Sequence, residues 1–237
     1  MRKTTLIISV LIGGIVAIVA ALPLAWIGPH IVPPQMAQGA QYSGTIWRGQ
    51  ANLSFAKSRA SVTFKTLPLK LFTGGGFLDF TVLNKSFNLR GVAGFNQAQD
   101  IQINADISQL PLRNPRIRGL HGQITSQIRS AEFGKQCKAI SGQARTDFLQ
   151  ANEATWFWRG PELTGPIRCD DGNIVIEMAG QEDGQGFTVD LRFKADGLYT
   201  ANIVVDSSDP RAAVVLSFYG FEARGARFEL SETGRWY

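Results

Sequence analysis

Apolar and polar residues alternate along much of the chain after residue 40. Ile101, Ile103, Ala105 and Ile107 alternate with polar residues, and residues 187–194 (FTVDLRFK) repeat the pattern. Because successive side chains of a strand point to opposite faces, this alternation predicts strands with one buried face. Weaker alternation predicts strands at 51–55, 59–64, 77–82, 124–128, 174–178, 199–205, 214–218 and 228–230, which makes ten or more in all.

Turn-forming residues separate these predicted strands, for example at 74–76 (GGG), 170–173 (DDGN) and 196–197 (DG). Such short connections favour antiparallel neighbours over parallel crossovers. Residues 67–72 and 146–155 are the best candidates for short helices, although both are equally compatible with loops. A sheet of about ten strands must curl or split, so we expect a mainly β fold, either an antiparallel, curved β-sheet or a sandwich. The pattern leaves open whether the apolar face is a filled core or an open, groove-forming surface.

The N-terminal region has a different pattern, with no charged residue from Thr4 to Gly28. As a helix these 25 residues span about 37 Å, enough to cross a hydrocarbon core of about 30 Å. We therefore expect one transmembrane helix, with Trp26 near the far interface and Arg2 and Lys3 holding the N-terminus in the cytoplasm. The alternative is a cleaved signal peptide, since small residues at 19–21 (VAA) offer a cleavage site.

Three prolines, at positions 29, 33 and 34, follow the apolar run and predict a partly extended linker. The expected organisation is a cytoplasmic start and anchor at 1–28, a linker at 29–41 and a β-rich domain at 42–237. In a Gram-negative cell the positive-inside rule places this chain in the inner membrane as a single-pass protein, with its bulk in the periplasm.

Both cysteines, Cys137 and Cys169, fall in the part expected to be periplasmic. In an oxidising compartment an even number of cysteines favours a disulfide. Two free thiols remain an alternative. A metal site is a weaker alternative, because the chain has only two histidines, His30 and His121, and no familiar zinc-ligand spacing.

Composition and charge exclude several classes of protein. Hydrophobic residues make up 44% of the chain and charged residues 18%, which rules out a disordered or coiled-coil protein. The net charge of +5 falls to +3 without Arg2 and Lys3, so nothing indicates nucleic-acid binding.

No motif for catalysis or for a cofactor is present. The chain contains no Gly-x-Ser-x-Gly sequence, and with so few histidines it offers little from which to build a catalytic triad. The glycines at 74–76 precede Phe77 rather than the Lys and Ser or Thr of a phosphate-binding loop. Asp170 and Asp171 are compatible with a cation site or paired carboxylates, but Asp-Asp-Gly-Asn is also typical of a tight turn. We therefore expect neither an enzyme nor a cofactor or metal site.

Three tryptophans are candidate interaction residues. Trp156 and Trp158 flank Phe157, and alternation would place both on one face of a strand. Such a strand is either buried or presents an aromatic patch to a membrane or a partner. Trp47 and Ile46 must point to opposite faces if they lie in a strand. One of the two can join the core, and the other must meet the linker, the membrane interface or another subunit.

Several segments together resemble the type II secretion system protein N family of Gram-negative bacteria. They are residues 21–26 (ALPLAW), 43–51 (SGTIWRGQA), Cys137 with 141–144 (SGQA), and 163–172 (LTGPIRCDDG). Their order and approximate spacing fit along nearly the whole chain, and the combination of the 43–51 motif with the anchor and the cysteine pair is fairly specific.

The resemblance implies a noncatalytic inner-membrane component of the machine that exports folded proteins from the periplasm across the outer membrane. It implies other type II secretion subunits as partners and brings no catalytic residues. The β-rich part of that family also resembles AsmA-like envelope proteins. This second likeness keeps an alternative open, a periplasmic lipid-binding or lipid-transfer groove protein.

Overall fold

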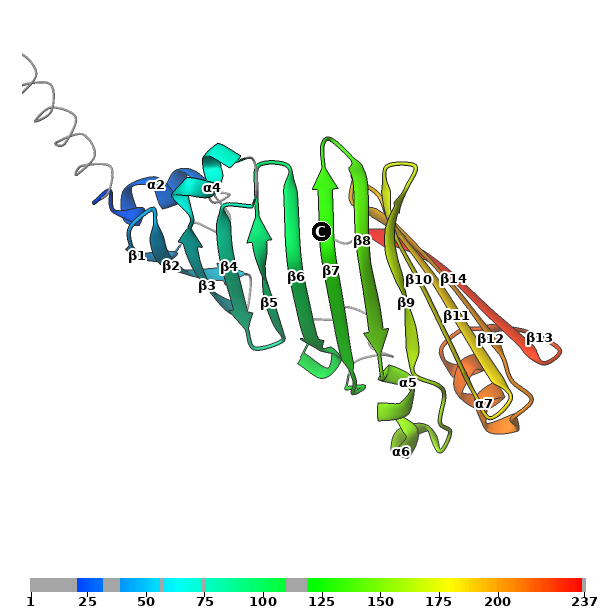
Figure 1. Cartoon of the computed structure of the whole chain (residues 1–237). Helices are drawn as coiled ribbons and strands as arrows, with labels where there is room; N and C mark the ends of the chain where they lie inside the picture. Colours follow the sequence, from blue (N-terminus) through cyan, green and yellow to red (C-terminus); the bar gives the residue numbers. More distant parts are fainter. Residues whose placement is uncertain (1–20, 32–38, 56–57, 74–75, 110–118, 236–237) are drawn as a thin grey trace, which may run out of the picture. The chain divides into compact units, whose positions relative to one another are not determined.

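The computed structural model of the protein describes residues 21–31, 39–55, 58–73, 76–109 and 119–235 (Figure 1). These residues form two compact units, one reaching to Lys85 and the other starting at Ser86. Most of the expected membrane anchor, including Arg2 and Lys3, lies outside the described residues. Within the described ranges, no helix has both the length and the apolar character needed to cross a membrane.

The first unit contains an antiparallel meander and two short helices. Its strands pair in chain order and are β1 (Gln41–Gly44), β2 (Arg48–Phe55), β3 (Ser58–Thr66) and β4 (Leu78–Asn84). Helix α2 (Leu24–Ile31) precedes β1, and helix α4 (Pro68–Thr73) connects β3 to β4 at one of the two places where a short helix was predicted. The buried side chains of Ala51, Leu53 and Ala60 share one face, because the register pairs Leu53 with Ala60.

Helix α2 runs across residue 28, where we expected the anchor to give way to an extended linker. Leu24 and Gly28 are spaced by four positions and therefore lie on the same side of the helix. Both are buried against the sheet of this unit. Packing of this side explains why the chain stays helical as far as Ile31 before the segment that leads to β1.

The second unit contains ten antiparallel strands in its described part. They are β5 (Phe87–Ala93), β6 (Gln97–Asp106), β7 (Gln123–Phe133), β8 (Cys137–Thr146), β9 (Leu163–Asp170), β10 (Asn173–Glu182), β11 (Gln185–Phe193), β12 (Leu198–Asp206), β13 (Glu222–Arg224) and β14 (Arg227–Arg235). Neighbours in the chain are neighbours in the sheet until β12, which pairs with β14, and β13 then forms the edge. The helices are η1 (Ile107–Gln109), α5 (Phe148–Ala151), α6 (Glu153–Trp156) and α7 (Pro210–Phe218).

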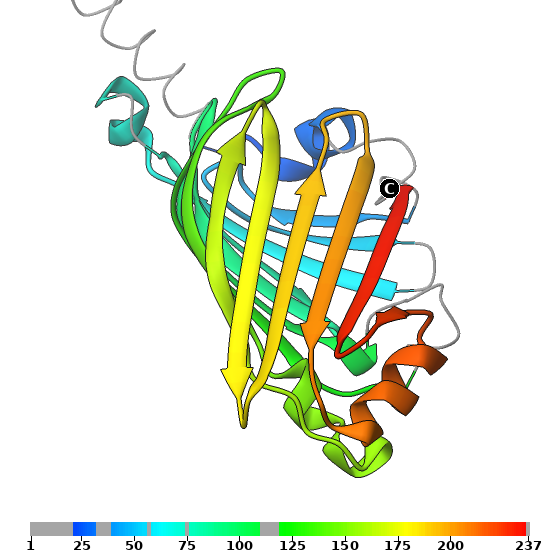
Figure 2. The same ribbon diagram turned by 90° about the vertical axis from the view of Figure 1, so that its right-hand side faces the viewer.

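The strands of this unit lie in one sheet, not in the two facing sheets of a sandwich. Strands β6 to β8 show their broad face in Figure 1, whereas β10 to β12 and β14 show theirs in the perpendicular view of Figure 2. The sheet of the second unit therefore turns strongly along its width. The predicted antiparallel, mainly β fold with ten or more strands is confirmed, and the sandwich alternative was wrong.

The alternation of side chains gives this sheet two different sides. Ile176 lies opposite Leu191 on one side, which we call the apolar face, and Glu177 lies opposite Asp190 on the other, the polar face. At one end of the strands the apolar face is covered by α7 and by the segment containing α5 and α6 (Figure 2). The buried cluster formed there consists of Leu149, Trp158, Leu163, Phe187, Val189, Val205, Ala212, Leu216 and Phe228.

Helix α7 occupies residues 214–218, where alternation predicted a strand. This prediction was wrong because the helix-starting signals lie just upstream. Pro210 stands in the first turn, and Asp209 caps the helix by accepting a hydrogen bond from the Arg211 amide. Ala212 and Leu216, four positions apart, then bury one side of the helix against the sheet.

The cap of α7 gives a pH-dependent prediction. The pKa of Asp209 lies below its ordinary value of 3.8, mainly because the Arg211 side chain donates hydrogen bonds to its carboxylate. A carboxyl group whose pKa is lowered by folding stabilises the folded state above its unfolded pKa, and that contribution disappears as the pH falls through the lowered value. We expect Asp209→Asn to lower the melting temperature slightly at pH 7, and by less as the pH falls below 3.8 to pH 3. An equal decrease at both pH values would contradict this role.

Candidate functional site

The motif at residues 43–51 contains the turn between β1 and β2. This turn binds the backbone of residues 22 and 23, near the end of the expected anchor. The amide of Ile46 donates a hydrogen bond to the carbonyl of Leu22 over 3.2 Å, and Thr45 forms an antiparallel bridge with Pro23. These contacts join a short stretch of backbone before α2 to the end of the β1–β2 hairpin. We call residues 22–24 together with residues 44–49 the entry clamp.

Side-chain packing completes the entry clamp. Leu24 is 6% exposed and lies over Gly49. A Cβ atom at Gly49 would come within 2.7 Å of Leu24 Cδ2 and 2.8 Å of Phe64 Cζ, closer than such atoms can pack. Glycine at this position therefore lets the first residue of α2 approach the sheet.

Two threonines fix the backbone of the turn. Thr45 Oγ1 accepts hydrogen bonds from the amides of Trp47 and Arg48 at 3.3 and 3.4 Å. Thr66 Oγ1 donates to the carbonyl of Ile46 over 2.9 Å, and the Thr66 amide donates to the carbonyl of Trp47 over 2.7 Å. Hydrogen bonds from within the motif and from the end of β3 thus hold the backbone of the turn.

Trp47 and Ile46 lie in this turn and not in a strand, so the expectation that they point to opposite faces does not apply. Both side chains are half-buried. Trp26 is 73% exposed on α2, where it remains a candidate for the membrane interface. The entry clamp was not predicted, because its contacts join residues about 25 positions apart. The only sequence signal for it was the pair of glycines at 44 and 49.

Gly44 is the most demanding position of the clamp. Its φ is +86°, and an added Cβ would lie 2.4 Å from the carbonyl oxygen of Arg48. We expect Gly44→Ala to lower the free energy of unfolding by about 2–3 kcal/mol, as urea denaturation of the full chain in mild detergent would measure.

Gly39→Ala is the matched control, because Gly39 also has a positive φ, +76°, but has no atom within 4 Å of an added Cβ. It should show only the conformational cost, about 1–2 kcal/mol. Equal effects of the two substitutions would mean that the tight packing of the turn contributes nothing.

The segment with Trp156 and Trp158 is not the predicted strand. Helix α6 ends at Trp156, and Phe157 follows with a left-handed φ of +52°. Trp158 is 2% exposed, and its Nε1 donates to Gln185 Oε1 over 2.7 Å. Trp156 is half-buried, and its Nε1 donates to the Tyr219 hydroxyl over 3.2 Å. The structure thus places Trp158 in the core and leaves Phe157, which is 77% exposed, at the surface.

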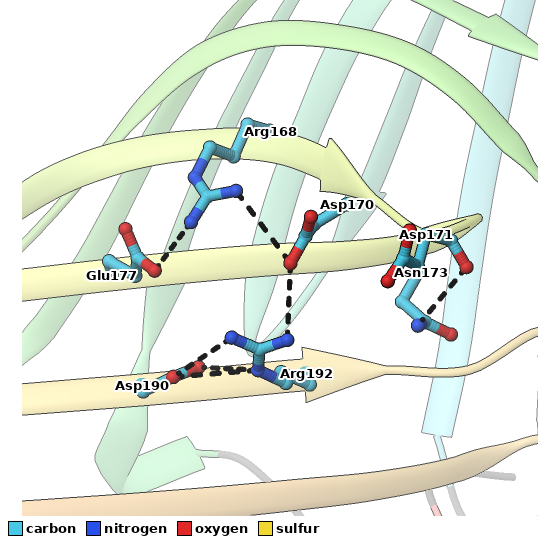
Figure 3. Close-up of polar contacts among 7 residues, drawn as sticks. All are labelled: Arg168, Asp170, Asp171, Asn173, Glu177, Asp190 and Arg192. Atoms are coloured by element: carbon cyan, nitrogen blue, oxygen red, sulfur yellow. Dashed lines mark hydrogen bonds and ion pairs between the residues drawn. The ribbon is translucent and has the colours of Figure 1, made fainter.

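Asp170 and Asp171, the candidate carboxylate pair, have different surroundings. Asp170 lies on the polar face, where Arg192 Nη1 approaches its Oδ2 to 3.2 Å and Arg168 Nη1 to 3.9 Å (Figure 3). Asp171 has a φ of +47° and forms the tight turn between β9 and β10 with Gly172. The turn interpretation therefore fits both the sequence and the backbone.

The ion pairs on the polar face continue across three strands (Figure 3). Arg168 on β9 pairs with Glu177 on β10 over 2.6 Å, and Arg192 on β11 pairs with Asp190. The pKa of Arg192 is raised, first by its hydrogen bond to Asp190 and then by the charge of that carboxylate. These side chains are about 40% exposed, so the pairs contribute little to stability, and they make this side of the sheet hydrophilic. In the described part of the chain, no three His, Cys, Asp or Glu residues lie together as metal ligands would.

The disulfide between Cys137 and Cys169 is confirmed. It joins the start of β8 to the end of β9, with a Cα–Cα distance of 5.7 Å. The Cys137 amide also donates a hydrogen bond to the carbonyl of Gly172 over 3.1 Å. The bridge therefore closes the chain segment that contains α5, α6 and both tryptophans.

A comparison with protein families decides the assignment that the motifs suggested. The model of the family described as type II secretion system (T2SS), protein N, matches residues 37–231. The chain belongs to this family. The matched range includes the 43–51 motif, both cysteines, the meander of the first unit and the second unit as far as residue 231, whereas helix α2 lies before it. No curated protein and no solved structure gives a significant match.

Proposed function

We propose that this member of the T2SS protein N family is a noncatalytic component of the secretion system in the inner membrane, where it supports export of folded periplasmic proteins across the outer membrane. The observation that carries the proposal is the family match over residues 37–231. The proposed partners of the protein are other secretion subunits of the inner membrane and periplasm.

The proposed location rests on the sequence before the first unit. The uncharged run from Thr4 to Gly28 behind Arg2 and Lys3 supports a single-pass anchor with a cytoplasmic N-terminus. A disulfide in the second unit fits an oxidising periplasm. The entry clamp then has a mechanical role, since it fixes the residues that follow the anchor to the first sheet.

Deletion of the gene in its host tests this function. Known type II substrates should accumulate, folded, in the periplasm and disappear from the medium on immunoblots. The intact chain, supplied from a plasmid, should restore export. Normal export in the deletion strain would reject the proposal.

A lipid-binding function is a second candidate, favoured by the apolar face of the second unit. Beyond the covered end, Ile101 and Ile176 are only half-buried on this face, and Leu191 and Ile203, which pack against the buried cluster, are half-buried as well. Half-buried aliphatic side chains on a strongly turned sheet offer a surface on which an acyl chain can lie.

A photo-crosslinking amino acid, placed in the full chain in its host membrane, distinguishes the lipid carrier from the secretion component. At Ile176 it would face the lipid of a carrier, and at Glu177 it would sit one residue away on the polar face. Lipid adducts at 176 and none at 177 would favour the lipid carrier. Absence of lipid adducts at both positions would leave the secretion component as the better account.

A further inference from the structure

The second unit ends in a sheet edge that only a short strand covers. β14 pairs with β12 over its whole length, Arg227–Arg235, but β13 pairs only with residues 227–229. Figure 2 shows β13 as a short arrow beside one end of β14. In the described part of the chain, no strand pairs with the outer side of residues 230–235.

β13 is short because of the connection that leads into it from α7. Gly220 has a φ of +90°, and the Phe221 amide donates to the carbonyl of Leu216 in α7 over 3.1 Å. β13 can therefore begin only at Glu222. The turn after α7 therefore limits how far β13 pairs with β14, and β14 extends beyond the residues that β13 covers.

The uncovered residues present hydrogen-bonding groups outward. The amide of Ser207 donates to the carbonyl of Ala226, which marks Asp206 and Arg227 as a pair without mutual hydrogen bonds in the β12–β14 ladder. The backbone groups of Arg227 therefore point away from β12. Because the direction alternates along a strand, those of Ser231, Thr233 and Arg235 point outward as well.

Three charged side chains near this edge have no ion-pair partner among the described residues: Glu222 and Arg235 on the polar face and Glu232 on the apolar face. Arg224, Arg227 and Glu229 pair with one another or with Asp206. Glu222 and Arg235 are exposed and form no ion pair within the described ranges. Glu222 also borders a hollow of about 450 Å³ on the polar face, together with Glu229 and Ser231.

We propose that this edge binds a second copy of the chain through antiparallel pairing of β14 with β14. The two-fold axis lies at Thr233, the centre of residues 231–235. In this register Thr233 faces Thr233, Ser231 faces Arg235 and Glu232 faces Gly234. Threonine pairs are favourable across antiparallel strands, and no like charges lie opposite each other. An axis at Glu232 would instead oppose two carboxylates.

The same register pairs the two unpaired charges of the polar face. Arg235 of one copy lies opposite Ser231 of the other. Glu222 of that other copy lies opposite its own Glu229, so the incoming Arg235 continues the line of β13 two positions before Glu222. Residues two apart along a strand line share a face, so Arg235 and Glu222 meet on the polar face beside the hollow. The two-fold symmetry gives the dimer two such ion pairs. The proposal is independent of the secretion function and stands or falls on the oligomeric state.

Cysteine crosslinking of the full chain in its native membrane tests the register. Across the axis, two Thr233 Cα atoms lie about 5.5 Å apart, within the range that a disulfide spans. We expect Thr233→Cys to give a disulfide-linked dimer on mild oxidation. Ser231→Cys is the matched control, because two Ser231 residues would be about 14 Å apart along the strands and should give almost none.

A charge reversal then tests the ion pair. Glu222→Arg or Arg235→Glu alone should lower the crosslinked fraction of Thr233→Cys by about tenfold, and the two together should restore it. Both side chains are exposed, so the variants should keep the melting temperature of the parent. Equal crosslinking at 231 and 233, no dimer at 233, or a crosslink to a different protein would each overturn the proposal.

Discussion

Replacing Trp158 by alanine is expected to lower the free energy of unfolding by about 3–5 kcal/mol. The ring is almost fully buried and lies 5.6 Å from the ring of Phe187 and 6.2 Å from that of Trp156. Alanine leaves a cavity beneath α5 and α6 and removes the hydrogen bond to Gln185. The loss is a large part of the 5–15 kcal/mol that a domain typically has. Urea denaturation of the full chain in mild detergent measures it.

Phe157→Ala is the control for this substitution. Phe157 is the adjacent residue but is largely exposed, so its truncation should change the free energy of unfolding by less than about 0.5 kcal/mol. Similar losses at 157 and 158 would show that the core does not lie where the structure places it.

The second large effect concerns the disulfide. Replacing Cys137 and Cys169 together by serine should lower the free energy of unfolding by about 3–4 kcal/mol, because it releases a closed loop of about 30 residues in the unfolded chain. A reducing agent should destabilise the unchanged protein by a similar amount and should leave the serine variant unaffected. A serine variant as stable as the parent would contradict the structural role of the bridge.

Local patterns predicted many of the strands and the cysteine pair, although alternation predicted none of β1, β5, β8, β9 and β13. The alternation at 101–107 and 187–194 predicted the strands now seen as β6 and β11, since the period of two is a property of the strand itself. Cysteine count and expected compartment predicted the bridge, which the structure forms between neighbouring strands.

Helix capping and tertiary contacts decided what the alternation of side chains could not. At 214–218 alternation is also compatible with a helix, and the cap at Asp209 with burial of Ala212 and Leu216 selects α7. At 156–158 the aromatic residues suggested a strand, but Phe157 adopts a left-handed conformation and separates a half-buried Trp156 from a buried Trp158. The entry clamp depends on contacts between Leu24 and Gly49 that no local pattern encodes.

The fraction of a type II substrate that reaches the medium tests the central claim most directly. It should be measured by quantitative immunoblot of medium and periplasm in three strains: the deletion strain with an empty plasmid, with the intact chain, and with the chain lacking residues 1–28. A resident periplasmic protein controls for leakage. We expect export only with the intact chain, and substrate held in the periplasm in the other two strains. Equal export in all three would contradict a role as an anchored component of type II secretion.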